Sequence, residues 1–486
     1  MVVQTQIENG VGVVVIDNPP VNALSKDVAE GVLNAFQELL ANDEVRAIVI
    51  SAAGRTFVAG ADVKQFQGMI QEGLCEQGAG LYELTSQIED SSKPVICAIF
   101  GTTLGGGLEL AMACHYRIAL AGAKIGQPEV KLGLIPGAGG TQRLPRLCGL
   151  AKAAEIIGFG DPLSVEDGKE WGIIDEVVES DLLEKAIEYA LRQSNDGPRP
   201  TKDLDEKLQF DADVRTQIND VRMAAVERYQ GAMASFHALD AVEKAGELSF
   251  EDGLAIENEL FVKALSSEEA RNLIYLFFAE REAGKIPALK AQDTFQPADT
   301  VGFPGLFSDD VGILEELIKA KIALQIVDRQ ELVNAEVDFL FLREVPEGSQ
   351  SQSLVEESPI VIDTSEFFQP EKIAELGFDP AKIVGLRFWP GKANFAEVGV
   401  TESTSPFAIK SVLELLKKLR CSFVVEKPTP HYASNRIREH RFDDSDLKIE
   451  VWKLVNEKNI ERASDIDLIQ VHCFGNPRHK SNAGMS

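Results

Sequence analysis

The strongest constraint on the fold is a repeated alternation between short apolar segments rich in β-branched residues and segments with helical spacing. Residues 11–16 form one such apolar run, residues 27–40 have helical periodicity, and residues 45–51 return to an apolar run. A second succession of strand, helix and strand follows over residues 93–120. Because neighbouring parallel strands need a crossover connection, usually a helix, this alternation predicts an α/β fold.

Composition and charge exclude several classes of protein. The 486 residues suffice for two to four domains, and 44% hydrophobic with 26% charged residues is typical of a globular chain. A net charge of −29 opposes binding to nucleic acid and to anionic membrane surfaces. The six cysteines have no metal-binding spacing, and there is neither a run of 18 apolar residues nor a basic leader. We therefore expect a cytoplasmic protein without a metal site or membrane insertion.

Changes in periodicity divide the chain into four segments. A first α/β domain is predicted over residues 1–192, and the polar stretch that follows, with several Gly and Pro residues, opens a helical segment over residues 193–290. Strand-like apolar runs then resume and predict a second α/β domain over residues 291–427. The mixed, charged residues 428–486 form the final segment.

Two turns of the first domain carry small residues where a strand ends or a helix begins. They lie at residues 57–62 and 103–111. Small residues let backbone N–H groups approach a ligand oxygen closely, and a helix N-terminus adds partial positive charge. Two N–H groups from separate turns can therefore form an oxyanion hole. The glycine triplet at residues 105–107, taken alone, equally fits a tight turn or close backbone packing.

Two carboxylates accompany these turns. Glu109 follows the glycine triplet, Glu129 lies 20 residues further along, and a third glycine-rich stretch over residues 134–145 leads into another helix. A single glutamate at either position would commonly cap a helix or face solvent. Two carboxylates beside an oxyanion hole instead indicate proton transfer.

With these motifs, residues 1 to about 190 resemble the crotonase, or enoyl-CoA hydratase/isomerase, family. The resemblance implies a crotonase-like ββα spiral in which the N–H groups of Ala61 and Gly106 hold a thioester oxygen. It also implies that Glu109 and Glu129 position and activate water. Further substrate contacts are implied for residues of the same turns: Ala59, Asp62, Lys64, Gly105, Pro136 and Gly137. Lys64 and Arg143 are candidates for contacts with the nucleotide of CoA, although both also fit ordinary surface cations.

The implied chemistry agrees with the residue types. An enoyl thioester gains negative charge on its carbonyl oxygen when water adds at Cβ, and preorganised N–H donors stabilise that charge. One carboxylate then acts as a base toward water while the other supplies a proton to Cα. The presence of both glutamates favours hydration, while an isomerase that moves a double bond from position 3 to position 2 can use only one.

The second half resembles another part of the same kind of protein. Residues 277–287 are similar to the helical linker of multifunctional fatty-acid oxidation proteins, which join a crotonase domain to a 3-hydroxyacyl-CoA dehydrogenase. Residues 300–475 follow the outline of that dehydrogenase. The resemblance implies a helical linker layer, a Rossmann-like domain and a truncated C-terminal helical remnant. Four residues fall where the dehydrogenase has its active-site motifs: Ser365, Arg387, Glu397 and Asn435.

This second domain departs from the dehydrogenase pattern at two positions of chemical importance. The stretch over residues 301–308 lacks the second and third glycines of a dinucleotide-binding motif, and Phe303 and Pro304 add bulk and remove an N–H group. Arg387 stands where the family has its catalytic histidine, and a guanidinium cannot accept a proton at neutral pH. Asp328 could face a ribose, or simply belong to a turn. We therefore expect a degenerate Rossmann-like dehydrogenase domain in which NAD binding is doubtful.

The sequence thus predicts an enoyl-CoA hydratase acting on 2-trans-enoyl-CoA, with accompanying 3,2-enoyl-CoA isomerisation and an inactive dehydrogenase half. It requires no cofactor, since coenzyme A is part of the acyl-CoA substrate. One alternative is a bifunctional hydratase and dehydrogenase that uses another base, such as His431. The other is a non-catalytic acyl-CoA-binding scaffold. A homo-oligomer and a complex with a fatty-acid oxidation partner are both compatible with the sequence.

Overall fold

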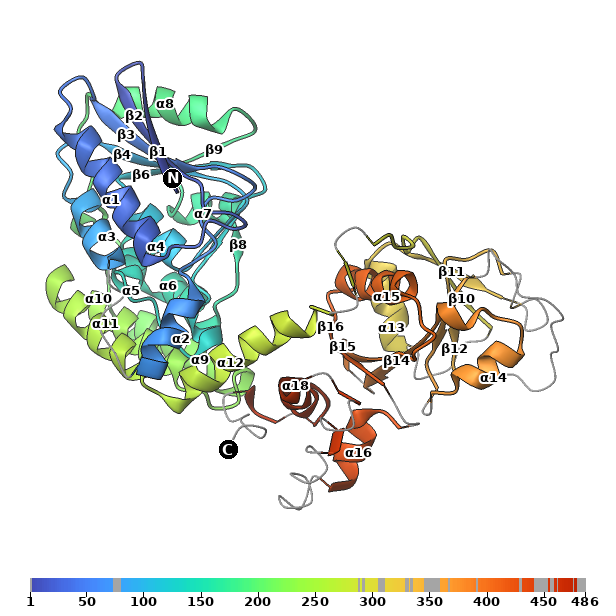
Figure 1. Cartoon of the computed structure of the whole chain (residues 1–486). Helices are drawn as coiled ribbons and strands as arrows, with labels where there is room; N and C mark the ends of the chain where they lie inside the picture. Colours follow the sequence, from blue (N-terminus) through green and yellow to red (C-terminus); the bar gives the residue numbers. More distant parts are fainter. Residues whose placement is uncertain are drawn as a thin grey trace. The chain divides into compact units, whose positions relative to one another are not determined.

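The computed structural model of this protein divides into two compact units, residues 1–274 and 275–486, and the boundary falls inside helix α12 (Glu268–Ala283) (Figure 1). The predicted division into four segments stays a prediction. The structure describes these residues: 2–72, 80–286, 289–290, 293–304, 311–327, 332, 335–344, 359–365, 368–389, 392–427, 431–440, 453–454, 459–460, 462–474 and 476–478.

The first unit is built on a six-stranded sheet with the strand order β1-β2-β3-β4-β6-β9. β1 pairs antiparallel with β2, and all other neighbours are parallel. The strands are β1 (Val3–Glu8), β2 (Val11–Ile16), β3 (Ala47–Ala52), β4 (Val95–Ile99), β6 (Tyr116–Leu120) and β9 (Glu176–Val178). A smaller sheet contains β5 (Thr102–Leu104), β7 (Lys124–Gly126) and β8 (Leu163–Ser164). The predicted α/β fold of this part of the chain is confirmed.

Helices cover both faces of the six-stranded sheet, as Figure 1 shows. α8 (Leu182–Gln193) lies on one face, where Ala186 and Ile187 join the apolar side chains of β2, β3 and β4 in one buried cluster. The other face carries α1 (Lys26–Ala41), α3 (Leu81–Glu89) and α4 (Gly106–Ala113). α1 begins at Ser25, whose hydroxyl accepts a hydrogen bond from Val28 N, as expected for an N-cap serine.

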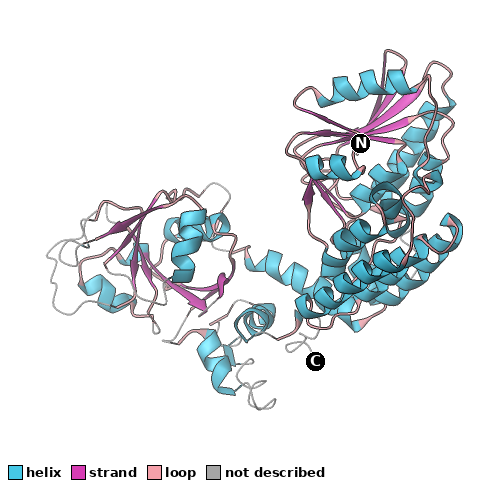
Figure 2. Ribbon diagram, turned by 180° about the vertical axis from the view of Figure 1, so that it is seen from behind, coloured by secondary structure: helices cyan, strands magenta, loops and turns pink. Residues whose placement is uncertain are grey.

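The part of the helical segment up to residue 274 packs directly on the first α/β region and belongs to the same compact unit, whereas residues 275–290 belong to the second unit. α9 (Ala212–Arg228) contacts α6 (Leu150–Phe159), α10 (Ala234–Ala245) contacts α5 (Gly140–Cys148) and α6, and α11 (Phe250–Leu265) contacts α5 and α10. Figure 2 shows these helices gathered beside the sheets. The remaining elements of the unit are α2 (Val63–Glu72), η1 (Glu129–Leu132), α7 (Val165–Trp171) and η2 (Thr201–Asp203).

The second unit contains a seven-stranded sheet with the order β11-β10-β12-β13-β14-β15-β16, in which only β14 and β15 pair antiparallel. Its strands are β10 (Thr300–Phe303), β11 (Ala323–Ile326), β12 (Phe339–Leu342), β13 (Ile360–Asp363), β14 (Ile383–Trp389), β15 (Lys392–Gly399) and β16 (Ser422–Glu426). Its helices are α13 (Val311–Lys319), α14 (Pro370–Glu375), η5 (Pro380–Lys382), α15 (Pro406–Lys418), α16 (Ala433–His440) and α18 (Ala463–Phe474). The mostly parallel sheet with its helices confirms the Rossmann-like prediction.

The described residues offer neither a membrane span nor a metal-binding cluster. Among them, no helix is both long and apolar enough to cross a membrane. In the same part of the chain, no group of three or more His, Cys, Asp or Glu side chains is arranged to hold a metal ion.

Candidate active site

Two backbone N–H groups meet where the predicted turns of the first unit approach each other. Ala61 is fixed by a β-bridge to Leu24, and Gly106 begins α4. A Cβ atom at Gly106 would lie 3.6 Å from Ala61 N. Within the described residues, neither of these two N–H groups has an acceptor. The turns therefore present two adjacent donors, as an oxyanion hole requires.

Glycine is required at two positions around these donors for different physical reasons. A Cβ at Gly107 would lie only 2.3 Å from Val58 O, so this glycine is required by close packing of the two turns. Gly105 has a φ of +51° and caps α4, a backbone conformation that favours glycine. The close-packing interpretation of the triplet is thus correct for Gly107, and this packing brings the Ala61 turn against the start of α4.

Glu109 projects from α4 and is 3% exposed. Its Oε1 accepts hydrogen bonds from Ala138 N at 2.7 Å and Gly140 N at 3.0 Å, both at the start of α5. Burial raises the pKa of Glu109, while these N–H groups and the Arg143 guanidinium oppose that rise because they stabilise the charged form. Glu109 is therefore held by N–H donors that favour its carboxylate form.

Glu129 begins η1 and lies beside the turn that leads into α4. A Cβ at Gly105 in this turn would be 2.8 Å from Glu129 Oε1. The amide nitrogen of Gln127, oriented to donate, lies 2.9 and 3.1 Å from the two Glu129 oxygens. Burial raises the pKa of Glu129 well above its usual value, and the Glu109 carboxylate raises it further. The two acids are thus inequivalent, because the pKa of Glu129 is raised by the Glu109 charge as well as by burial.

A third carboxylate, Glu257 of α11, was not predicted as part of the site. It is 1% exposed and accepts hydrogen bonds from Gly139 N at 2.6 Å, Thr141 N at 2.8 Å and Thr141 Oγ1 at 2.6 Å. Burial and the neighbouring Glu109 raise the pKa of Glu257 to about 8, although the donors oppose that rise. A sequence signal exists, because Glu257 shares the apolar face of its helix with Leu254 and Phe261.

The other predicted site residues of the first unit differ in exposure and in their hydrogen bonds. Ala59 N donates to Val21 O, and Asp62 Oδ1 accepts from Lys64 N at 3.1 Å in the first turn of α2. Lys64 is exposed and Pro136 is buried. The structure shows Asp62 as a helix cap.

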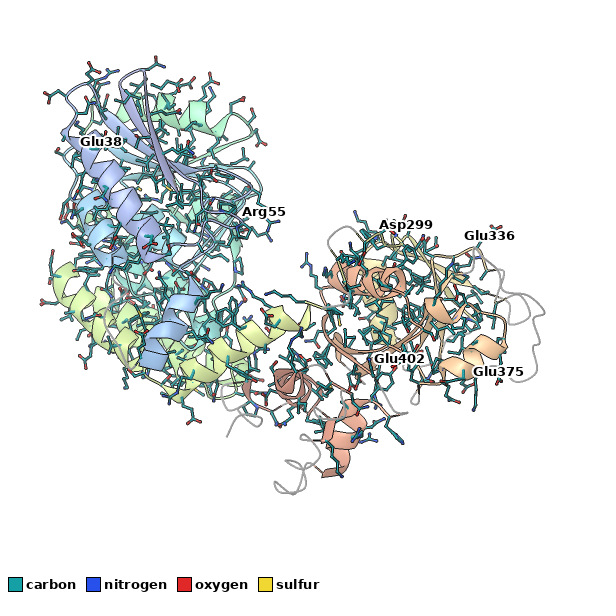
Figure 3. The ribbon with its side chains drawn as sticks, in the orientation of Figure 1. Glu38, Arg55, Asp299, Glu336, Glu375 and Glu402 are labelled. Carbon is teal, nitrogen blue, oxygen red and sulfur yellow. The ribbon has the colours of Figure 1, made fainter. Side chains whose placement is uncertain are left out.

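Arg143 lies in the interior of the first unit. It is 2% exposed, its Nη2 lies 2.9 Å from Glu89 Oε2, and its Nη1 donates to Ala138 O at 2.7 Å. The interpretation of Arg143 as a cation at the mouth of the site is therefore wrong, because its guanidinium is already paired and enclosed. By contrast, charged side chains such as Glu38 and Arg55 extend from the surface (Figure 3).

The four predicted residues of the second unit lie on or next to neighbouring strands. Arg387 and Glu397 are direct cross-strand partners in the β14–β15 ladder. Glu397 accepts hydrogen bonds from Ser434 N at 2.8 Å and Ser434 Oγ at 2.5 Å, and Asn435 follows in the same helix. Ser365 lies just after β13, with its N–H donated to Asp363 Oδ1 at 2.9 Å.

The electrostatics of this second site are dominated by Arg387 and two buried glutamates. Glu426, the second of them, was not predicted, and its Oε2 accepts from Ala433 N at 2.8 Å. Burial raises the pKa of Glu397 and raises that of Glu426 well above its usual value, and the Arg387 guanidinium opposes both rises. Arg387 thus serves as a counter-charge, and the cluster contains no histidine among its described partners.

The candidate dinucleotide motif is only partly described. Gly302 lies within β10, where a Cβ would be 2.7 Å from Val327 Cγ2, so packing inside the sheet explains this glycine. Residues 305–308 of the predicted motif and Asp328 lie outside the described residues. His431 precedes α16.

Comparison with known proteins gives the family. Residues 6–237 match the model of the family described as enoyl-CoA hydratase/isomerase. The chain is 36% identical over 328 residues to a peroxisomal bifunctional enzyme of Homo sapiens, covering 67% of this chain and 45% of that protein. For a protein of the same name from Cavia porcellus, identity is 29% over 498 residues, covering 92% and 68%.

A plant relative gives a similar result. The chain is 37% identical over 289 residues to a glyoxysomal fatty acid beta-oxidation multifunctional protein of Cucumis sativus, covering 58% of this chain and 40% of that protein. The chain thus spans less than half the length of the human and cucumber relatives. Together, these similarities show that residues 6–237 belong to the enoyl-CoA hydratase/isomerase, or crotonase, family.

Proposed function

We propose that this protein adds water to 2-trans-enoyl-CoA thioesters in its first unit. The observation that carries the proposal is that two N–H donors without acceptors, Ala61 and Gly106, lie close to two inequivalent acids, the buried Glu109 and the partly buried Glu129. Membership of the enoyl-CoA hydratase/isomerase family supports it. The names of the relatives, which describe bifunctional and beta-oxidation proteins, agree with this reaction class.

In the proposed mechanism, the thioester oxygen accepts hydrogen bonds from Ala61 N and Gly106 N. These donors stabilise the enolate-like charge that develops when water attacks Cβ, and removal of one such donor typically costs roughly 10²- to 10³-fold in rate. Glu109, whose carboxylate form is supported by N–H groups, removes a proton from the attacking water. Glu129, which keeps its proton because of burial and the neighbouring Glu109, delivers it to Cα.

Substrate binding follows from the same turns. In this proposal the reaction needs no cofactor, because coenzyme A is part of the substrate. We assign Ala59, Gly105, Pro136 and Gly137 to the walls around the reacting thioester. Lys64 is exposed on the turn that follows Ala61 and is our candidate for a phosphate contact. Movement of a double bond from position 3 to position 2 needs the same enolate stabilisation and belongs to the same proposal.

We further propose that the second unit transfers no hydride and binds no NAD. Arg387 faces Glu397 across the β14–β15 ladder, and its guanidinium cannot act as a base at neutral pH. Gly302 is used for packing inside β10. Both observations support a domain that keeps the fold of a dehydrogenase without its proton acceptor.

One experiment tests both proposals in sequence. A 2-trans-enoyl-CoA of short or long chain is added to the protein, the loss of conjugated enoyl absorbance is followed, and NAD is then added to the same cuvette. We expect loss of absorbance without later NADH formation. NADH formation would support the bifunctional alternative with another base such as His431, and no change at either step would favour the non-catalytic acyl-CoA-binding scaffold.

Location and assembly are also proposals. The widely spaced cysteines and the polar composition support a cytoplasmic location, whereas several relatives are named peroxisomal or glyoxysomal, so imaging of the tagged chain decides. We propose a homo-oligomer or a complex with a fatty-acid oxidation partner, which light scattering of the purified chain tests.

A further inference from the structure

Glu257 is a buried carboxylate that the proposed mechanism does not use. It comes from α11, far along the chain from both Glu109 and Glu129, and its oxygens contact only the start of α5 among the described hydrogen bonds. The same helix supplies Phe261, which lies so close to the backbone that a Cβ at Gly137 would be 2.6 Å from its ring. α11 therefore contacts the glycine-rich turn at two points.

The N–H groups of this turn alternate between two acids. Ala138 N and Gly140 N donate to Glu109, whereas Gly139 N and Thr141 N donate to Glu257. Because the four donors are consecutive in a single turn, a displacement of either carboxylate moves the donors of the other. The position of Glu109 is thus linked to that of Glu257 through backbone atoms.

The charged groups that face this cluster come from several elements. Glu129 of η1 lies near both other acids, and an ionised Glu109 or Glu257 raises the pKa of Glu129. Arg143 of α5 lies against Gly139 and is paired with Glu89 of α3. In the contacts of the described residues, Glu257 itself is held by neutral donors only.

We propose that Glu257 is a positioning residue of the hydration site, which holds the turn at residues 138–141 so that the N–H groups of Ala138 and Gly140 fix Glu109. The inference rests on the proposed function. It makes the helical segment part of the reaction machinery, because α11 supplies the acceptor that completes the turn. Glu257 acts through Glu109 and Glu129 and needs no contact with the substrate.

The test is Glu257→Gln, which keeps the size of the side chain, with Glu259→Gln as the matched control on the exposed face of the same helix. The neutral amide presents N–H groups toward the Thr141 donors, so the turn shifts. We expect kcat for hydration to fall roughly 10- to 100-fold, the size of effect that a small displacement of a catalytic group produces. KM should change much less, and Glu259→Gln should match the parent.

A pH profile separates positioning from simple helix stability. Above its own pKa of about 8, Glu257 is ionised and raises the pKa of Glu129. Glu257→Gln lacks this charge, so Glu129 loses its proton earlier and the alkaline limb of kcat moves to lower pH. A parental kcat and pH profile would overturn the inference. So would a lower kcat with an unmoved alkaline limb and reduced thermal stability, since a purely structural cap gives that result.

Two further measurements keep the outcomes distinct. If Glu257→Gln does not fold, Thr141→Val removes one donor to Glu257 and should lower kcat in the same direction by a smaller factor; a parental rate there would overturn the inference. If the parent chain hydrates no enoyl-CoA, or Glu109→Gln keeps the parental rate, the proposed function itself fails. That failure appears before the Glu257 variants are compared.

Discussion

Both units place a pair of buried glutamates at the N-terminus of one helix, and the two pairs differ in their counter-charge. In the first unit, α5 donates Gly140 N to Glu109 and Thr141 N to Glu257. In the second, α16 donates Ser434 N to Glu397 and Ala433 N to Glu426. Glu397 faces a guanidinium across the sheet, whereas Glu109 lies on α4, whose first residue, Gly106, has an N–H group without an acceptor among the described residues.

This difference teaches what a buried acid pair needs for proton transfer. In the second unit, burial raises the pKa of Glu397 and of Glu426, and the Arg387 guanidinium opposes both rises, so a counter-charge inside the cluster partly balances the pair. In the first unit, Arg143 is paired with Glu89, Glu109 raises the pKa of both Glu129 and Glu257, and Glu257 raises that of Glu129. Proton occupancy there responds to small changes of charge, as acid–base catalysis requires.

The comparison predicts its largest effect for the acids of the first unit. Glu109→Gln and Glu129→Gln should each lower kcat for enoyl-CoA hydration by roughly 10²- to 10⁴-fold, because each removes one proton-transfer group. Loss of enoyl absorbance measures the rate. Glu38→Gln, an exposed carboxylate on α1, is the control and should match the parent. Near-parental rates in both site variants would show that this acid pair is as inert as the one in the second unit.

A smaller effect is expected at the turn between the acids and the N–H donors. Gly105→Ala forces a side chain into a φ of +51° and places a Cβ 2.8 Å from Glu129 Oε1. The displaced acid should lower kcat by roughly 10²-fold while circular dichroism shows a folded chain. Gly122→Ala is a useful control, because it also has a positive φ, of +79°, with nothing within 4 Å of the added Cβ. Equal activity of the two variants would contradict a contact between the turn and Glu129.

The pH dependence should follow the inequivalence of the two acids. The base must be ionised, and because burial raises the pKa of Glu109, hydration should fall about tenfold per pH unit below a midpoint that lies above the usual glutamate range. The acid must be protonated, and because the pKa of Glu129 is well above its usual value, activity should persist through neutral pH and decline at alkaline pH. Profiles of kcat/KM check this. A midpoint at the usual glutamate value would contradict the buried site.

The smallest effect on activity is expected in the second unit. Arg387→Met leaves Glu397 and Glu426 without their counter-charge, so we expect a loss of about 1–3 kcal/mol in the stability of that unit. The hydration rate should stay at the parental value. Denaturant unfolding with the hydration assay in parallel measures both. A large fall in hydration would show that the two acid pairs are coupled.

The sequence predicted the fold of both units because that information is local. Apolar β-branched runs and helical spacing are properties of neighbouring residues, and the strands at residues 11–16, 45–51 and 93–100 are found close to their predicted limits. The turns that carry Ala61 and Gly106 were predicted from small residues in the same way. Their catalytic roles, and those of Glu109 and Glu129, stay predictions that the assays above test.

The parts that sequence analysis missed depend on contacts between distant segments. Glu257 and Glu426 carry no motif, and their importance appears only when a helix N-terminus from another segment donates to them. Arg143 looked like a surface cation because a sequence does not show that Glu89 lies opposite. The pairing of Arg387 with Glu397 depends on the register of β14 and β15, which a single sequence does not fix.

The two carboxylates that alternate as acceptors at the start of α5 also determine how long a fragment of this chain must be to contain the complete site. A fragment that ends at residue 192 retains the residues of both turns and both proposed catalytic acids, yet it leaves Gly139 N and Thr141 N without the carboxylate of Glu257. It also uncovers the backbone of Gly137, which Phe261 covers. The shortest transplantable version of the site therefore extends through α11.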